Sequence, residues 1–149
     1  MIGGVVIKKI EKFSDERGWL AEIFRNDEID FQPAMEYISQ TQPGVLRGPH
    51  EHVAQSDFFI FLFGTFRVYL WDNRIGAENY RQLETIDVGD KNPCAILVPP
   101  GVVHAYKCIS AEPGMVINLP DKLYRGKNKK EDVDEVRWEN MSDSPFIVD

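Results

Sequence analysis

Short apolar runs separated by glycine- and proline-containing turns recur along most of the chain. The clearest pattern is FRVYLWD at residues 66–72, where one aliphatic and aromatic face alternates with a more polar face at the period of two that is typical of a strand. No segment shows a long helical period. Further strands are predicted at residues 5–10, 19–24, 34–41, 58–63, 83–88, 95–98, 102–108 and 115–119. Eight or more short strands predict an all-β sandwich or barrel, and a double-sheet jelly roll would satisfy the strand edges.

The stretch 44–64, GVLRGPHEHVAQSDFFIFLFG, combines the strongest apolar run with two histidines. Residues 58–63 are apolar at every position, which predicts a strand buried on both faces, in the core or at a dimer interface. His50 and His52 are two residues apart, so on an extended strand their side chains point to the same side. His104, the third and last histidine, follows a Pro-Pro-Gly turn. We therefore expect the three imidazoles to converge at one mouth of the β-structure.

Length and composition indicate a single soluble domain, 1–149, with 43% hydrophobic and 28% charged residues. The net charge of −7 argues against binding to nucleic acid or to an anionic membrane surface. No apolar stretch is long enough to span a membrane, and the first residues lack a secretory signature. Cys94 and Cys108 are too few for a disulfide framework, which favours a reduced, cytoplasmic protein.

The last part of the chain, 121–149, is predicted to be a polar tail that wraps around the body. Trp138 and Phe146 are its candidate anchors, and the charged run 126–135 is interpreted as solvated surface.

Imidazoles gathered with a carboxylate can do two kinds of chemistry. His50, His52, His104 and Asp57 could ligate one divalent metal ion, or they could form an acid–base site without a cofactor, since the unperturbed pKa of histidine is near ~6.5. Asp57 itself is a metal ligand, a partner that orients a histidine, or a plain polar strand residue.

Arg47 lies an odd number of residues from His50, so a regular strand would aim it away from the pocket. A bulge at Gly48-Pro49 would turn it inward; otherwise Arg47 forms ion pairs on the surface.

Two sets of motifs resemble known proteins. Gly44, His50, His52, Asp57 and Gly64, with Pro99, Gly101 and His104 later, resemble the two signature motifs of the cupin superfamily. FSDERGWLAEIF (13–24), GVLRGPH (44–50) and PPGVVHAY (99–106) are similar to the three segments that mark the dTDP-4-dehydrorhamnose 3,5-epimerase family. The resemblance implies a cupin-type double-stranded β-helix, a homodimer, no metal cofactor, and a nucleotide-linked 4-keto-6-deoxyhexose as substrate.

The resemblance also implies roles for individual residues. His50 matches the catalytic base, Arg47 the substrate contact, and Arg17 and Glu22 the residues that hold the nucleotide diphosphate. The related dTDP-sugar 3,4-ketoisomerases carry two histidines like His50 and His52 and a tyrosine at the position of Tyr37. The predicted catalytic residues are His50, His52, Tyr37 and Asp57, and the predicted substrate-binding residues are Arg17, Glu22, Arg47, Gln55, His104 and Asn118.

The chain departs from the epimerase pattern at several of these positions. Asn118 stands where the family has a tyrosine acid, Asp57 replaces a lysine that steadies the enolate, and His52 replaces a glutamine. The tyrosines that could supply the acid are Tyr37, Tyr106 and Tyr124. The sequence thus predicts an epimerase or isomerase that serves surface-polysaccharide synthesis. A metal-dependent cupin and a non-catalytic module that binds sugar nucleotides are the alternatives.

Overall fold

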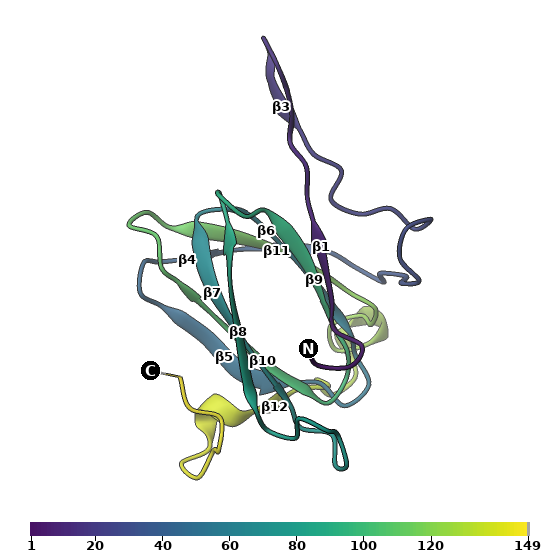
Figure 1. Ribbon diagram of the computed structural model, residues 1–149. Coiled ribbons are helices and arrows are strands. Elements are labelled where there is room, and N and C mark those ends of the chain that lie inside the picture. The colour runs from purple at the N-terminus through teal and green to yellow at the C-terminus, as the bar shows by residue number, and fades with distance from the viewer. Residues whose placement is uncertain (149) are drawn as a thin grey trace.

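The computed structural model describes residues 1–148 as two five-stranded antiparallel sheets that face each other (Figure 1). The first sheet has the order β1-β9-β6-β11-β4, and its strands are β1 (Val6–Lys9), β9 (Cys94–Val98), β6 (Asp57–Phe63), β11 (Gly114–Pro120) and β4 (Tyr37–Thr41). The second has the order β12-β5-β10-β7-β8, and its strands are β12 (Val136–Arg137), β5 (Leu46–Glu51), β10 (Val102–Cys108), β7 (Thr65–Asp72) and β8 (Leu83–Gly89). The all-β prediction is confirmed.

The main core lies between the two sheets. On β7 the side chains of Phe66, Val68 and Leu70 are buried in this core, as the alternation in the sequence predicted. Tyr69 and Trp71 point to the other face of the same strand. The period-two pattern therefore assigned both faces of β7 correctly.

The tail covers that outer face of β7. Phe146 is only 3% exposed and packs against Trp71 and Trp138, with ring centroids 5.6 and 5.0 Å away. Both predicted anchors of the tail are confirmed. In Figure 1 the yellow C-terminal segment runs along the outside of the sheet that contains β5 and β12.

β6 is buried on both faces within one chain. Phe59 and Phe61 point into the main core, while Phe58, Ile60 and Leu62 pack under residues 10–31. The strand is therefore core, the first of the two environments predicted for it.

The N-terminal third departs from the predicted strands. The strand expected at residues 19–24 is only the short β3 (Gly18–Leu20), which pairs with β2 (Phe13–Asp15) in a hairpin. Figure 1 shows this hairpin projecting away from the two sheets. Residues 21–24 instead turn inward, where Ala21, Ile23 and Phe24 pack against the outer face of β6.

The remaining elements are two single-turn 3-10 helices in the tail, η1 (Lys127–Lys129) and η2 (Trp138–Asn140). None of the helices among residues 1–148 is long and apolar enough to cross a membrane.

Candidate active site

A β-bulge places His50 and Arg47 on the same side of β5. His50 pairs with His104 on β10, but Arg47 pairs with Tyr106, so three steps along β5 match two steps along β10. Gly48 lies inside the bulge with φ of 84°, and a Cβ on it would lie 2.6 Å from the backbone oxygen of His104. Arg47 therefore lines the same pocket as His50, which confirms the bulge that would turn it inward.

Replacing Gly48 with alanine is expected to destabilise the protein by about 2 kcal/mol or more. The left-handed conformation costs a residue with a Cβ ~1–2 kcal/mol, and the contact with the backbone of β10 adds to this. Urea unfolding measures the loss. Gly44→Ala is the matched control, since Gly44 also has a positive φ but its Cβ would meet no atom within 4 Å. Equal losses in the two variants would contradict a steric role for Gly48.

The three histidines converge, as the sequence predicted. The ring centroid of His50 lies 4.5 Å from that of His104, and the ring of His52 is 6.0 Å from each of the others. One ring nitrogen of each residue lies within 4.8 Å of those of the other two. Hydrogen-bonded pairing of β5 with β10 brings about this convergence of residues more than fifty positions apart.

Asp57, on β6 of the opposite sheet, contacts two of the three histidines through its carboxylate. Its Oδ2 lies 3.0 Å from Nε2 of His52 and 3.6 Å from Nε2 of His104. Its Oδ1 accepts hydrogen bonds from the side-chain amides of Gln55 and Asn118, at 3.0 and 2.8 Å. Asp57 is 1% exposed. Asp57 thus contacts two histidines, which is the arrangement expected of a partner that orients a histidine.

The surroundings shift the pKa values of the histidines in opposite directions. Burial, and then the neighbouring His104 and His52, lower the pKa of His50 to about 2. Burial also lowers the pKa of His104. For His52 burial opposes the charge, but the hydrogen bond and the charge of Asp57 outweigh it and raise the pKa. For Asp57 burial raises the pKa, but the hydrogen bond from His52 and the charges of both histidines outweigh it and lower the pKa to about 2. These shifts favour a charged His52–Asp57 pair beside a neutral His50.

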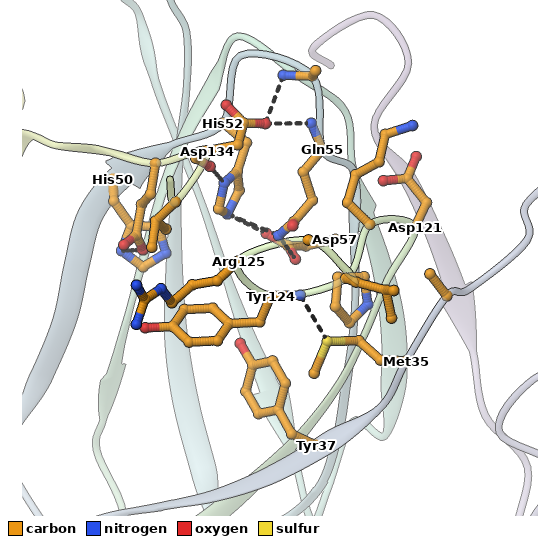
Figure 2. A pocket seen from close by; sticks show the side chains of 18 of the residues that line it. Met35, Tyr37, His50, His52, Gln55, Asp57, Asp121, Tyr124, Arg125 and Asp134 are labelled. Carbon is orange, nitrogen blue, oxygen red and sulfur yellow. Dashed lines mark hydrogen bonds and ion pairs between the residues drawn. The ribbon is translucent and has the colours of Figure 1, made fainter. Parts of the chain in front are cut away.

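All three tyrosines considered as proton donors line this pocket: Tyr37, Tyr106 and Tyr124. Asn118 donates a hydrogen bond to the Tyr37 hydroxyl at 3.0 Å, so it connects that phenol to Asp57. Burial raises the pKa of Tyr37 to about 12 and also raises that of Tyr106. Both phenols therefore carry their protons at neutral pH. Figure 2 shows Tyr37 and Tyr124 on the same side of the pocket, below the histidines and Asp57.

The pocket has a volume of about 1350 Å³, which suits a ligand larger than a single sugar ring. Its walls come from β4, β5, β6 and β10 and from residues 120–139. Arg17 and Glu22, which were predicted to bind the substrate, do not line it. Arg17 pairs with Asp15 in the projecting hairpin and Glu22 pairs with Arg25, so a single chain does not bring them to the histidines.

The tail contributes pocket-lining side chains that the sequence analysis missed. The carboxylate of Asp134 accepts hydrogen bonds from three consecutive backbone amides, those of residues 53–55. Glu135 and Glu139 lie 3.8 and 4.0 Å from Nδ1 of His50. The interpretation of residues 126–135 as solvated surface is therefore wrong at its end, because β12 pairs with β5 and draws these residues into the site. The predicted anchors Trp138 and Phe146 were the one signal that the tail is fixed to the body.

Fold and site define a jelly-roll protein with a pocket of acid–base groups that spans both sheets. The chain belongs to the family described as dTDP-4-dehydrorhamnose 3,5-epimerase, whose sequence profile matches residues 1–141. The recognition made from the three sequence segments is thereby confirmed, and the protein is an enzyme of the epimerase and isomerase class.

Two curated relatives resemble the chain over most of their length. The probable low-salt glycan biosynthesis epimerase Agl13 of Haloferax volcanii is 36% identical over 139 residues, which cover 91% of this chain and 86% of that protein. The spore coat polysaccharide biosynthesis protein SpsL of Bacillus subtilis is 34% identical over 125 residues, which cover 83% of each protein.

Solved structures confirm the cupin-type jelly roll. A dTDP sugar isomerase from Desulfovibrio desulfuricans G20 matches with a TM-score of 0.84 at 21% identity, over 98% of this chain and 91% of that one. The sugar 3,4-ketoisomerase QdtA from Thermoanaerobacterium thermosaccharolyticum matches with a TM-score of 0.70 at 19% identity, over 92% and 90% of the two chains.

Proposed function

We propose that this enzyme transfers a proton at a carbon next to the C4 ketone of a dTDP-linked 4-keto-6-deoxyhexose. His50 is the base. The observation that carries the proposal is a neutral imidazole lying in a large pocket beside the buried His52–Asp57 contact, in a chain of this family. The product would enter the synthesis of a surface polysaccharide or glycan, as the names of the two curated relatives suggest.

The pocket supplies the groups that this reaction needs. When His50 takes the proton, the electrons of the broken C–H bond move to the ketone oxygen and form an enolate. The guanidinium of Arg47 lines the same pocket and can stabilise this negative charge.

The fate of the enolate decides the product. A proton from Tyr37 on the face opposite His50 would invert the carbon and leave a tyrosinate that regains its proton from solvent. A proton returned by His50 on the same face, together with transfer between the neighbouring oxygens, would shift the ketone. Asn118 is assigned to hold the Tyr37 hydroxyl and Gln55 to hold Asp57. His104 was predicted to bind the substrate, but it is only 2% exposed and does not line the pocket, so we assign it no contact with the substrate.

Incubation with dTDP-4-keto-6-deoxyglucose in heavy water tests the proposal. We expect deuterium at C3 or C5 in the recovered sugar, or a ketone that has moved, both read by NMR. Binding of the nucleotide sugar in calorimetry without exchange or a new product would instead indicate a module that only binds.

In the predicted homodimer, Arg17 and Glu22 could bind the substrate of the partner subunit, whereas within one chain they do not reach the pocket. The hairpin that carries Arg17 leaves the body and exposes Phe13 and Leu20, which suits insertion into a second copy. We propose that the hairpin reaches the partner's pocket and there holds the diphosphate.

Mixing experiments test this arrangement. Arg17→Ala and His50→Asn variants, each inactive alone, should regain activity when mixed, because the mixed dimer has one intact site. A monomer in analytical ultracentrifugation, or no recovery on mixing, would refute it.

We also propose that the protein is cytoplasmic. Cys94 and Cys108 are free thiols, which supports this location.

A metal-dependent reaction is the second candidate, because ring nitrogens of His50, His52 and His104 gather around one point. Two features weigh against it. A bound zinc ion would draw its nitrogen ligands to roughly 3.4 Å from one another, whereas these are up to 4.8 Å apart. His52 would also have to give up the proton that it shares with Asp57. We therefore propose no cofactor, and stoichiometric metal in the purified, active protein would overturn this choice.

A further inference from the structure

Arg125 is a pocket-lining arginine whose guanidinium has no partner within the part of the chain that the structure describes (Figure 2). The other arginines of residues 1–148 each make at least one hydrogen bond or ion pair: Arg17, Arg25, Arg47, Arg67, Arg74, Arg81 and Arg137. A guanidinium stays charged at every pH at which a protein is folded, and it offers several N–H donors. An arginine that uses none of them inside the protein, yet lines a pocket, indicates a binding group for an anionic ligand.

The backbone of Arg125 is strained in a way that also points to a ligand. Its φ is 57°, in the left-handed region that a residue with a Cβ rarely adopts. A hydrogen bond of 2.8 Å from the backbone amide of Glu131 to the carbonyl of Arg125 closes the loop and holds this conformation. Strained residues of this kind persist only where their surroundings fix them, and they cluster at ligand-binding sites.

Arg81 shows what the same backbone conformation does elsewhere in the chain. Its φ is 59°, and it lies outside the pocket. Its guanidinium donates a hydrogen bond to Asn73 at 3.0 Å and lies over the rings of Tyr80 and Phe146. The left-handed turn at Arg81 therefore serves contacts within the protein. The guanidinium of Arg125 makes no such contact among residues 1–148, so its function lies with a molecule that binds.

Arg125 lies in the middle of a basic segment, residues 122–130, which we call the basic strap. The strap holds four lysines and one arginine and no acidic residue, whereas the whole chain has a net charge of −7. Lys122, Arg125 and Lys129 line the pocket. Cations gathered in this way favour a ligand that carries more than one negative charge.

The strap is fastened to the body at both ends. Asp121 before it and Asp134 after it accept hydrogen bonds of 2.8–2.9 Å from the backbone amides of residues 53–56. Between these two points the backbone amide of Tyr124 contacts Sδ of Met35 at 3.1 Å, as Figure 2 shows. The carboxylates outside the strap therefore hold it across the pocket, and its basic side chains are left for a ligand.

We propose that the basic strap binds the diphosphate of the nucleotide-linked sugar, with Arg125 as the residue that contacts it directly. The inference rests on the proposed function, which supplies a substrate with two phosphates. A guanidinium presents parallel N–H donors that match phosphate oxygens in pairs, whereas Lys122 and Lys129 add charge without this geometry. In the proposed dimer the diphosphate then lies between the strap of one subunit and the hairpin of the other.

The acidic residues that line the pocket leave most of the positive charge of the strap in place. All but Glu131 are already paired: Asp57 with His52, Asp121 and Asp134 with the amides of residues 53–56, and Glu135 and Glu139 with Arg137. The carboxylate of Glu131 lies against Gly126 of the strap. The three pocket-lining cations of the strap therefore outnumber the one carboxylate beside them.

Calorimetry of the full chain with dTDP and with thymidine tests the strap. Arg125→Ala should weaken the binding of dTDP about 10- to 100-fold, the loss typical of hydrogen bonds between charged groups. The affinity for thymidine, which has no phosphate, should not change. Arg125→Lys should recover part of the loss, because it keeps the charge but not the paired donors. Arg81→Ala is the matched control, since it removes the other left-handed arginine outside the pocket, and it should bind dTDP like the wild type.

Three results would overturn the inference. They are equal affinities of the wild type and Arg125→Ala for dTDP, an equal loss for dTDP and thymidine, and a wild type that does not bind dTDP. Inorganic pyrophosphate tests for a site that takes a free anion instead, and it would overturn the assignment to a nucleotide sugar by binding as tightly as dTDP.

Kinetics separate the strap from the proton-transfer groups. Arg125→Ala should raise KM for the nucleotide sugar with kcat nearly unchanged, whereas His50→Asn should lower kcat. Calorimetry with dTDP needs no turnover. It therefore decides the role of Arg125 even if the wild type converts no keto sugar and the proposed function fails.

Discussion

Replacing His50 with asparagine should abolish deuterium exchange into the nucleotide-linked keto sugar, with a fall in kcat of about 10³-fold or more. His50 is the imidazole of the cluster that is neutral and has no contact with Asp57. General-base catalysis contributes roughly 10²–10⁴-fold to the rate of a reaction. NMR of the recovered sugar, with its deuterium content at C3 and C5, measures the effect.

The fold of this variant should remain intact, because His50 lies at the pocket rather than in the apolar core. Thermal unfolding at neutral pH checks this point. The matched control is Asp87→Asn, which breaks the exposed ion pair with Arg67 on the far side of the second sheet and should leave exchange unchanged. Exchange by His50→Asn at the wild-type rate would refute the assignment of the base.

The strands that the sequence predicted well are those whose burial follows a regular rule. β7 alternates because one face meets the core and the other meets the tail, and β6 is uniformly apolar because residues 10–31 cover its second face. β12 could not be predicted, since a two-residue strand has no periodicity of its own. Its position depends on pairing with His50 and Glu51 and on the docking of Trp138.

The site was predictable where it rests on spacing within motifs. His50, His52 and His104 were expected to meet, and they do, since His50 lies on β5, His52 directly follows it, and His104 lies on the neighbouring strand β10. The inward orientation of Arg47 depended on a bulge, which the adjacent Gly48 and Pro49 indicated. Arg17 stays a prediction, because its role requires a second copy of the chain.

The tail residues of the site escaped prediction for a physical reason. Asp134 meets His52 across 82 positions, and no local pattern marks which of several acidic residues in the charged run will be buried. The site therefore combines a part encoded in motifs, the histidines, with a part created by tertiary docking, the carboxylates around them.

Acid should destabilise this protein well before its carboxylates titrate. The folded pKa of His50 is about 2, and the unfolded value is 6.5. Below pH 6.5 the unfolded state therefore binds a proton at His50 that the folded state does not bind. The free energy of unfolding then falls by about 1.4 kcal/mol for each unit that the pH decreases. At pH 4.5 His50 alone should cost about 2.7 kcal/mol relative to neutral pH. His104 acts in the same direction, because burial lowers its pKa as well.

The ion pair in the site modifies this slope in two pH windows. The raised pKa of His52 contributes stability that is fully present below pH 6.5 and lost as pH rises through its folded pKa, so it offsets part of the loss. The lowered pKa of Asp57 contributes stability that is present above pH 3.8 and lost as pH falls toward 2. The net expectation is a steady loss from pH 6.5 to 4 that steepens below it.

Urea unfolding of the wild type and of His50→Asn at pH 7 and pH 4.5 separates the contribution of His50. Asparagine does not titrate, so the variant should lose about 2.7 kcal/mol less than the wild type between the two pH values. The same loss in both proteins would show that His50 is accessible to protons in the folded state. In that case its burial would not keep it in the neutral form that a base requires.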